Sequence, residues 1–268
     1  MPLVKSAFLN SLGAGTALAD GGIGSLIFQL TGRLASADFV YEALNLRNAE
    51  LIQGIYSSSL AAGATVLTTN TFAANSTELA AAGVGDQVAE INNAAVNIAR
   101  DAISGHIVEY SIDNTEFFVI GSIGPGGSDV DAYSSQIDAL IAGSIDALLL
   151  ETFSDIDLAM GLTKAITSRP DSPPVIVHGA LDPSVGDYLE WPIDPATFVD
   201  QAASAGASVA GINCVAPWVA TEFVLAASAS SAVLAGELLL SAMPNAGGFE
   251  RIGHRFLTRA NPEYMGTL

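Results

Sequence analysis

Ala147-Leu148-Leu149-Leu150 is an unbroken apolar run that ends at Glu151, and a helical stretch and a second apolar run, Val175-Ile176-Val177, follow it. Strands that are apolar throughout are buried on both faces, which is typical of a parallel sheet covered by helices. This strand–helix–strand succession therefore predicts an α/β fold.

The same alternation recurs along the chain. Seven predicted strands end just before Asp20, Asn70, Gly121, Glu151, His178, Asn213 and Asn245. Helical stretches are predicted over residues 49–62, 87–103, 137–142, 156–166, 195–205 and 219–229. A chain of 268 residues fits a barrel, and it has no Gly-x-Gly-x-x-Gly or Walker-type loop that would favour a nucleotide-binding fold. We predict a single (β/α)8 TIM-type barrel domain over residues 1–268, with the eighth strand missing or replaced.

The composition excludes several classes of function. Lys and Arg number 9 and Asp and Glu number 28, which gives a formal net charge of −19. Nucleic acids and anionic membrane surfaces need clustered basic side chains, so neither is expected as a partner. The single cysteine excludes an intrachain disulfide. No apolar stretch reaches the ~20 residues that cross a bilayer, and polar residues interrupt the N-terminal apolar segment, so we expect a cytoplasmic protein.

Polar residues gather at the predicted strand ends. They are Asp20, Asn70, Ser122, Glu151, His178, Asn213, Cys214 and Asn245. In a parallel barrel these ends converge on the face that holds the active site. Each residue also has a structural alternative. Asp20 and Asn70 suit turns, and Glu151 suits the start of a helix. His178 suits a hydrogen-bonded core position, and Cys214 suits a small buried one. Their common place at strand ends favours an active site.

Seven short blocks add a more specific signal. They are Asp20-Gly21-Gly22-Ile23-Gly24-Ser25; Glu42-Ala43-Leu44-Asn45-Leu46 with Asn48-Ala49-Glu50-Leu51-Ile52; Ala62-Gly63-Ala64 with Thr68-Thr69-Asn70-Thr71-Phe72-Ala73-Ala74-Asn75; Gly121-Ser122-Ile123-Gly124-Pro125; Leu149-Leu150-Glu151-Thr152-Phe153-Ser154-Asp155; Gly211-Ile212-Asn213-Cys214; and Pro244-Asn245-Ala246-Gly247. In this order they resemble the homocysteine S-methyltransferase family, from about Ala19 to Met265. The sequence is most similar to the homocysteine-binding barrel of cobalamin-dependent methionine synthase and to S-methylmethionine-type transferases.

The resemblance implies a methyltransferase that acts on the thiol of homocysteine, or a related thiol, and so belongs to methionine biosynthesis. A thiol reacts as its thiolate, and zinc ligation deprotonates a bound thiol near neutral pH. In the family three cysteines hold the zinc, and Cys214 matches the first of them. The residues that would surround homocysteine are Asp20, Gly21, Thr69, Asn70, Ser122, Glu151 and Asn213. Glu151 and Asp20 would be the catalytic carboxylates that pair with its ammonium group.

The chain departs from the family pattern at the metal. The family's other two ligands are adjacent cysteines in a Gly-Gly-Cys-Cys-Gly-Thr block, which has no counterpart here. A catalytic zinc needs three protein ligands, so Cys214 is an incomplete set, with His178 as a conceivable addition. Three readings stay open: a natural short form closed otherwise or completed by a partner, a truncated chain, and a member that abandoned zinc.

Two other functions follow from this departure. One is a zinc-free, catalytically inactive or divergent barrel that binds a small molecule or a partner protein. The other is a zinc-free transferase that uses Asp20, Glu151 or His178 as acid and base groups. A sheet without its eighth strand also leaves unpaired backbone groups at an edge, so we expect a homo-oligomer or a partner protein there.

Overall fold

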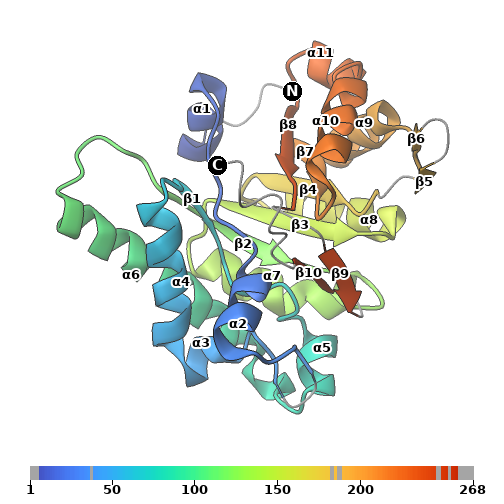
Figure 1. The fold of residues 1–268 in the computed structure, drawn as a ribbon. Helices are drawn as coiled ribbons and strands as arrows, with labels where there is room; N and C mark the ends of the chain where they lie inside the picture. The colour runs from blue at the N-terminus through green and yellow to red at the C-terminus, as the bar shows by residue number, and fades with distance from the viewer. Residues whose placement is uncertain are drawn as a thin grey trace. The chain divides into compact units, whose positions relative to one another are not determined.

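A computed structural model of the chain describes residues 6–36, 39–181, 184–185, 189–245, 249–252 and 255–258 (Figure 1). The chain divides into two compact units, of which the first ends at Leu148 and the second begins at Leu149. Strand β3 (Ala147–Phe153) runs across this boundary. Within the described residues, no helix combines the length and the apolarity that a membrane span requires.

The first unit consists of two parallel strands and the helices that accompany them. Its elements are α1 (Ala7–Ala14), α2 (Ile23–Thr31), α3 (Leu44–Arg47), α4 (Ala49–Ala61), β1 (Val66–Thr68), α5 (Ser76–Ala81), α6 (Val88–Tyr110), β2 (Phe118–Ile123) and α7 (Ser134–Ala142), with 3-10 turns at Gly85–Gln87 and Val130–Tyr133. In the β1–β2 pair Val66 lies opposite Phe118, and Thr68 lies opposite Ile120. Every residue of β2 is buried, as a parallel strand covered by helices requires.

Helices α4 and α6 lie side by side in this unit (Figure 1). The side-chain oxygen of Asn48 accepts a hydrogen bond from the Leu51 N–H and caps the start of α4. Gly63 follows the end of α4 with a φ of 99°, a conformation that glycine adopts without strain. One face of each helix is buried by apolar residues at helical spacing: Ile52, Ile55, Tyr56 and Leu60 in α4, and Ile91, Ala95, Ile98 and Ala102 in α6.

The second unit continues the alternation of strands and helices. After β3 come α8 (Ile156–Thr167), β4 (Val175–Gly179), α9 (Pro195–Ala205), β7 (Val209–Asn213), α10 (Pro217–Ala227), α11 (Ser231–Leu234) and β8 (Leu239–Met243). Two short antiparallel pairs join β5 (Ser184–Val185) with β6 (Leu189–Glu190), and β9 (Phe249–Ile252) with β10 (Arg255–Thr258). In the parallel strands β4, β7 and β8, His178 lies opposite Gly211, and Gly211 lies opposite Ser241. The six-stranded sheet has the order β1-β2-β3-β4-β7-β8.

The predicted α/β class is confirmed, but one predicted strand is wrong. Residues 16–19 form no strand, and only Ala19 makes an isolated parallel bridge to Val66. Gly13 and Gly15 precede this segment and Leu18 is 56% exposed, so it has no buried face to stabilise a longer ladder.

The predicted strand ends also need correction. Glu151, His178 and Asn213 lie within β3, β4 and β7 rather than after them, and Ser122 lies within β2. Apolar runs underestimate these strands because a polar residue ends the run while the strand itself includes that residue. The start of α8 is capped by Asp155, whose Oδ1 accepts a hydrogen bond from the Leu158 N–H, so Glu151 is not the cap.

Candidate active site

Glu151, Asn213 and Cys214 come together in the second unit, where β3 and β7 end. The Asn213 Nδ2 group donates hydrogen bonds to Glu151 Oε2 at 3.0 Å and to Thr152 Oγ1 at 2.8 Å. In return the Thr152 N–H donates to Asn213 Oδ1 at 3.1 Å. The Thr152 hydroxyl also lies 3.9 Å from Cys214 Sγ. The Asn213 amide at the end of β7 therefore fixes the carboxylate of Glu151 in β3.

Two residues of this cluster have an unusual backbone. Thr152 has a φ of 63° and Cys214 a φ of 58°, in the left-handed region that non-glycine residues seldom adopt. For the β-branched Thr152 this conformation is a genuine outlier. Such strain costs on the order of 1–3 kcal/mol per residue and gathers at functional sites. The strained backbone and the polar side chains therefore indicate the same candidate active site.

The thiol of Cys214 is held in its neutral form. Burial, and after it the negative charge of Glu151, raise the pKa of Cys214 to about 12, although the hydrogen bond from Thr152 acts in the opposite direction. Only the thiolate is a strong nucleophile or metal ligand. At neutral pH Cys214 is therefore unreactive as the cluster stands.

Alkylation of Cys214 tests this electrostatic arrangement. At pH 8 we expect iodoacetamide to modify the folded protein at least ~100-fold more slowly than a free cysteine with an ordinary pKa. Glu151→Gln removes the carboxylate charge but keeps an acceptor oxygen for Asn213, so it should lower the pKa of Cys214 and speed alkylation roughly three- to tenfold. Mass spectrometry of this single cysteine gives the rates. Glu222→Gln, on an exposed position of α10, is the control, and equal rates in both variants would contradict the assignment.

His178 lies in β4 as a fully buried side chain without a visible partner. Its exposure is 0%, and neither ring nitrogen has a hydrogen-bond partner among the described residues. Burial lowers the pKa of His178 to about 3, so the ring is neutral at physiological pH. A base this weak cannot take a proton from a thiol near pH 7. The interpretation of His178 as a hydrogen-bonded core residue also lacks support from the described residues.

The burial of His178 predicts a pH-dependent stability. The unfolded chain binds a proton at His178 below pH ~6.5, whereas the folded protein binds it only near the lowered pKa of about 3. This contribution to stability is therefore complete above pH ~6.5 and is lost as the pH falls toward 3. Between pH 7 and pH 5 wild-type protein should lose about 2 kcal/mol more than His178→Leu. Urea unfolding at each pH measures this difference, and parallel curves for the two proteins would contradict it.

In the first unit the carboxylate of Asp20 is bound to β1. Its Oδ2 accepts the Thr68 N–H and its Oδ1 accepts the Thr68 hydroxyl, both at 3.0 Å. Two further polar side chains follow at the end of the strand. The Thr69 hydroxyl lies 2.6 Å from that of Thr71 and accepts the Ser122 N–H at 3.0 Å. The first unit therefore brings Asp20, Thr69 and Ser122 to the ends of β1 and β2.

The loop of residues 69–75 is held by buried side chains that the sequence analysis did not select. The Asn45 Nδ2 group donates to the Asn70 carbonyl at 2.9 Å, and the Tyr56 hydroxyl accepts the Asn70 N–H at 2.9 Å. Three more hydrogen bonds to the loop join Glu42 Oε1 to Ala73 N–H at 3.0 Å, Asn92 Nδ2 to the Ala74 carbonyl at 3.0 Å, and Gln136 Nε2 to the Thr71 carbonyl at 2.6 Å. For Tyr56 and Asn92, which lie in predicted helices, a polar residue on the buried face was the available signal, since such groups need partners.

The last two predicted site residues are Gly21 and Asn245. Gly21 is exposed between Asp20 and α2, and nothing lies within 4 Å of the position that a side chain would take. Asn245 is 8% exposed in the second unit, and its backbone N–H donates to the Val215 carbonyl at 2.8 Å. Neither residue contributes a side-chain contact to the two clusters above.

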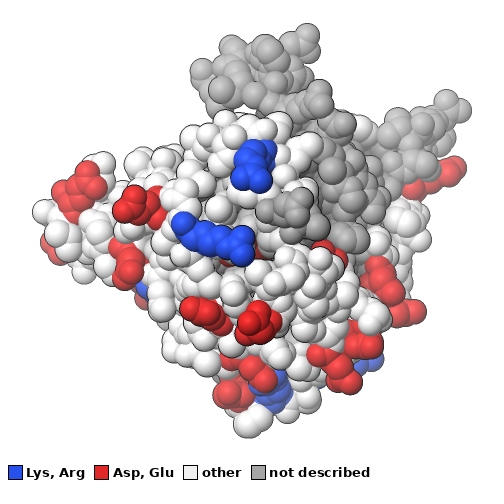
Figure 2. All heavy atoms as spheres, turned by 90° about the horizontal axis from the view of Figure 1, so that it is seen from below, with Lys and Arg blue, Asp and Glu red and all other residues white. Residues whose placement is uncertain are grey.

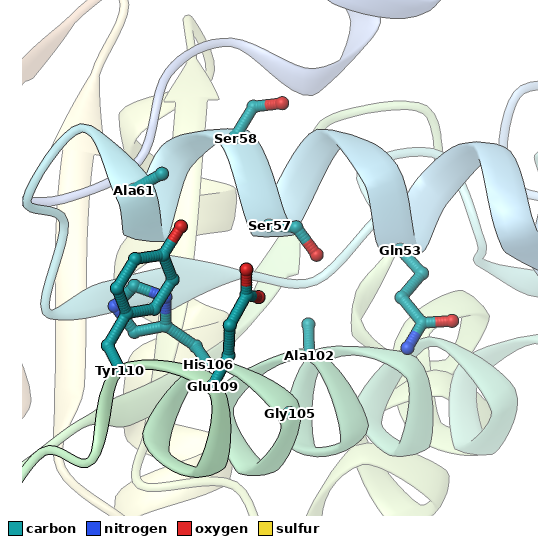
Figure 3. A pocket seen from close by; sticks show the side chains of 9 residues that line it. All are labelled: Gln53, Ser57, Ser58, Ala61, Ala102, Gly105, His106, Glu109 and Tyr110. Carbon is teal, nitrogen blue, oxygen red and sulfur yellow. The ribbon is translucent and has the colours of Figure 1, made fainter.

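A groove between α4 and α6 is separate from all of these residues. Its volume is about 470 Å³. It is lined by Gln53, Ser57, Ser58, Ala61, Ala102, Gly105, His106, Glu109 and Tyr110 (Figure 3). The rings of His106 and Tyr110 pack together, with centroids 4.8 Å apart. None of the predicted site residues lines this groove.

The zinc ligands expected from the resemblance do not come together. Among the residues that the structure describes, no three His, Cys, Asp or Glu side chains form a group that could hold a metal ion. Cys214 is the only cysteine of the sequence, and its thiol is neutral at pH 7. A catalytic zinc requires three protein ligands, so the part of the chain that the structure describes does not fit one.

Comparison with known proteins identifies the family. The sequence matches the homocysteine S-methyltransferase family over residues 17–267. It is 26% identical over 222 residues to the methionine synthase of Mycobacterium leprae (strain TN) and 26% identical over 223 residues to that of Mycobacterium tuberculosis (strain ATCC 25618 / H37Rv). Each alignment covers 77% of this chain but 18% of the relative, so the chain spans less than a fifth of these proteins.

The fold is similar to that of the homocysteine methyltransferase MmuM from Escherichia coli, a TIM-type barrel. The TM-score with the metallated form is 0.72 at 23% identity, over 89% of this chain and 86% of that one. With the apo form it is 0.63 at 20% identity, over 85% and 90%. The predicted barrel class is thereby confirmed. Because the family match extends over nearly the whole sequence, the chain belongs to the homocysteine S-methyltransferase family of enzymes.

Proposed function

We propose that this chain transfers a methyl group to the thiol of homocysteine and so forms methionine. The observation that carries the proposal is the Glu151–Asn213 pair, because a carboxylate fixed at 3.0 Å by a buried amide is preorganised to bind an ammonium group. The family match supports homocysteine as the acceptor. Asp20, whose two oxygens are fixed by Thr68, is proposed as the other carboxylate for this substrate.

The reaction needs correct placement of the thiol and a route for its proton. An electron pair of the homocysteine sulfur forms a bond to the methyl carbon, the bond from methyl to donor breaks with its electron pair left on the donor, and the thiol proton is released to solvent water. Glu151 is proposed to orient the amino acid. Of the acid and base candidates, it is the one that lies beside Thr152 and Cys214, the two residues with a strained backbone. We do not propose His178 as the base, because burial lowers its pKa to about 3.

The sequence has a single cysteine, and this favours a second candidate function. If this protein does not activate the thiol as its family does, the fold would serve as a zinc-free barrel that binds a small molecule or a partner protein. The surface gives no support to a nucleic acid as that partner. Figure 2 shows acidic side chains spread over the face in view, with few basic ones between them, in keeping with a net charge of −19. We also propose that the edge of the sheet binds a second copy of the chain or a partner protein.

The deciding experiment is a methyl-transfer assay with homocysteine and S-methylmethionine, in which methionine formation is measured with and without added zinc. Elemental analysis of the purified protein gives zinc per chain in parallel. We expect homocysteine-dependent methionine formation that is lost in Asp20→Ala and in Glu151→Ala. Full activity in both variants would disprove the proposed roles of these carboxylates. Absence of turnover with zinc added, together with calorimetric binding of homocysteine, would favour the second candidate.

A further inference from the structure

Tyr56 is a buried polar residue of the first unit to which neither the resemblance nor the proposed reaction assigns a role. It lies on the inner face of α4 with an exposure of 0%. Its hydroxyl accepts the Asn70 N–H at 2.9 Å, just after β1. Burial raises the pKa of Tyr56 well above its ordinary value, and the nearby negative charge of Asp20 raises it further. The hydroxyl therefore stays protonated and lies within the field of the Asp20 carboxylate.

A short chain of contacts joins this hydroxyl to Asp20. Thr68, two residues before Asn70, donates its N–H and its hydroxyl to the two carboxylate oxygens of Asp20. Asn70 is itself fixed on its side chain, since its Nδ2 group donates to the Tyr41 carbonyl at 2.7 Å and to Asn45 Oδ1 at 3.0 Å. Tyr56 supplies the acceptor for the backbone of the same residue. The end of β1 carries Thr68, which donates to Asp20, and it is held through Asn70. Tyr56 binds the backbone of Asn70, and Tyr41 and Asn45 bind its side chain.

We propose that Tyr56 is a positioning residue, whose hydroxyl holds the Thr68–Asn70 strand end and thereby sets the place of the Asp20 carboxylate for the ammonium group of the amino acid substrate. The inference rests on the proposed function in so far as Asp20 binds that ammonium group. Tyr56 itself touches no reacting atom in this scheme. Loss of the Tyr56 hydroxyl should therefore weaken the binding of homocysteine, and leave the binding of the methyl donor and the rate of the chemical step unchanged.

Tyr41 offers a matched control. It is a second tyrosine of the same unit with 0% exposure, and its hydroxyl donates to the Arg33 carbonyl at 2.8 Å. The contact of Tyr41 with Asn70 is made by its backbone carbonyl, which Tyr41→Phe retains. Tyr41→Phe and Tyr56→Phe each remove one buried hydroxyl. Comparing the two variants therefore separates the general effect of losing a buried hydroxyl from the specific effect of losing the Tyr56–Asn70 hydrogen bond.

The test compares the kinetics of both variants with the wild type. For Tyr56→Phe we expect the KM for homocysteine to rise roughly tenfold, while kcat and the KM for S-methylmethionine stay within about twofold. For Tyr41→Phe all three constants should stay within about twofold of the wild type. An equal KM for homocysteine in the two variants, or an equal rise in both KM values of Tyr56→Phe, would overturn the proposal.

A second readout does not depend on catalysis. The pKa of Asp20, followed by the carbon chemical shift of its carboxyl group in the unliganded protein, should be higher in Tyr56→Phe because its donors are less well placed. Tyr41→Phe should leave it at the wild-type value. If wild-type protein fails to methylate homocysteine, the proposed function is wrong, and this titration alone decides whether Tyr56 fixes the carboxylate. An Asp20 pKa that is the same in all three proteins would show that it does not.

Discussion

Glu151→Ala is expected to lower kcat/KM for homocysteine methylation by roughly 100-fold, because a charge-assisted hydrogen bond to an ammonium group is worth about 1.5–3 kcal/mol. The carboxylate is fixed by Asn213 Nδ2 at 3.0 Å, so little reorganisation is needed when the substrate binds. Glu151→Gln keeps an oxygen that accepts this hydrogen bond but has no charge. It should lose nearly as much activity and still retain the local structure.

Initial rates at varied homocysteine concentration measure the loss. Glu222→Ala is the control in the same unit, because this glutamate is exposed on α10 and belongs to no described cluster. Its kcat/KM should stay within about twofold of the wild type. If Glu151→Gln retains wild-type activity, the charge of Glu151 does not bind the substrate, and the role of the Glu151–Asn213 pair is structural.

Gly211→Ala is expected to lower the free energy of unfolding by about 3–5 kcal/mol, or to prevent folding, because overpacking against backbone leaves no room for relaxation. Gly211 lies in β7 between His178 of β4 and Ser241 of β8. A methyl group on Gly211 would overlap the Ser241 carbonyl and lie 3.1 Å from His178 Nε2. Close approach of neighbouring strands, rather than an unusual φ, is what requires glycine here.

Gly54→Ala gives the opposite expectation and serves as the control. Gly54 is exposed in the interior of α4, and nothing lies within 4 Å of the position that its methyl group would take. Alanine should therefore stabilise the protein by up to about 1 kcal/mol. Urea unfolding of both variants measures the contrast. A Gly211→Ala protein as stable as the wild type would mean that β7 and β8 are farther apart than the structure shows.

Much of the fold could be predicted from sequence because its elements are set by local physics. Residues 195–205 were predicted as a helix that starts after Asp194, and α9 has these bounds with the Asp194 carboxylate as its cap. The strand at residues 16–19 was wrong because apolar spacing does not reveal whether a segment has a face to bury. The ends of β3 and β7 were placed too early because their polar side chains, Glu151 and Asn213, are hydrogen-bonded to each other and remain within the strands.

The candidate site could be predicted in part for a related reason. Glu151, Asn213 and Cys214 were found because each follows an apolar run and matches a family block. Thr152 was not selected, although it contacts both Asn213 and Cys214, because a threonine within a predicted strand gives no sign of a positive φ. The contacts of Asn45 and Tyr56 with Asn70 join residues 25 and 14 positions apart, and spacing alone does not indicate them.

The hydrogen bonds to residues 69–75 also constrain the order in which the first unit can assemble. Their partners come from α3, α4, α6 and α7 and from the segment before α3, so the local hydrogen bonds of this loop are supplemented by non-local ones from many elements. Non-local contacts form only after the intervening chain has been brought together. The segment that carries Thr69 and Asn70 therefore acquires its native shape late in folding, once the surrounding helices have packed.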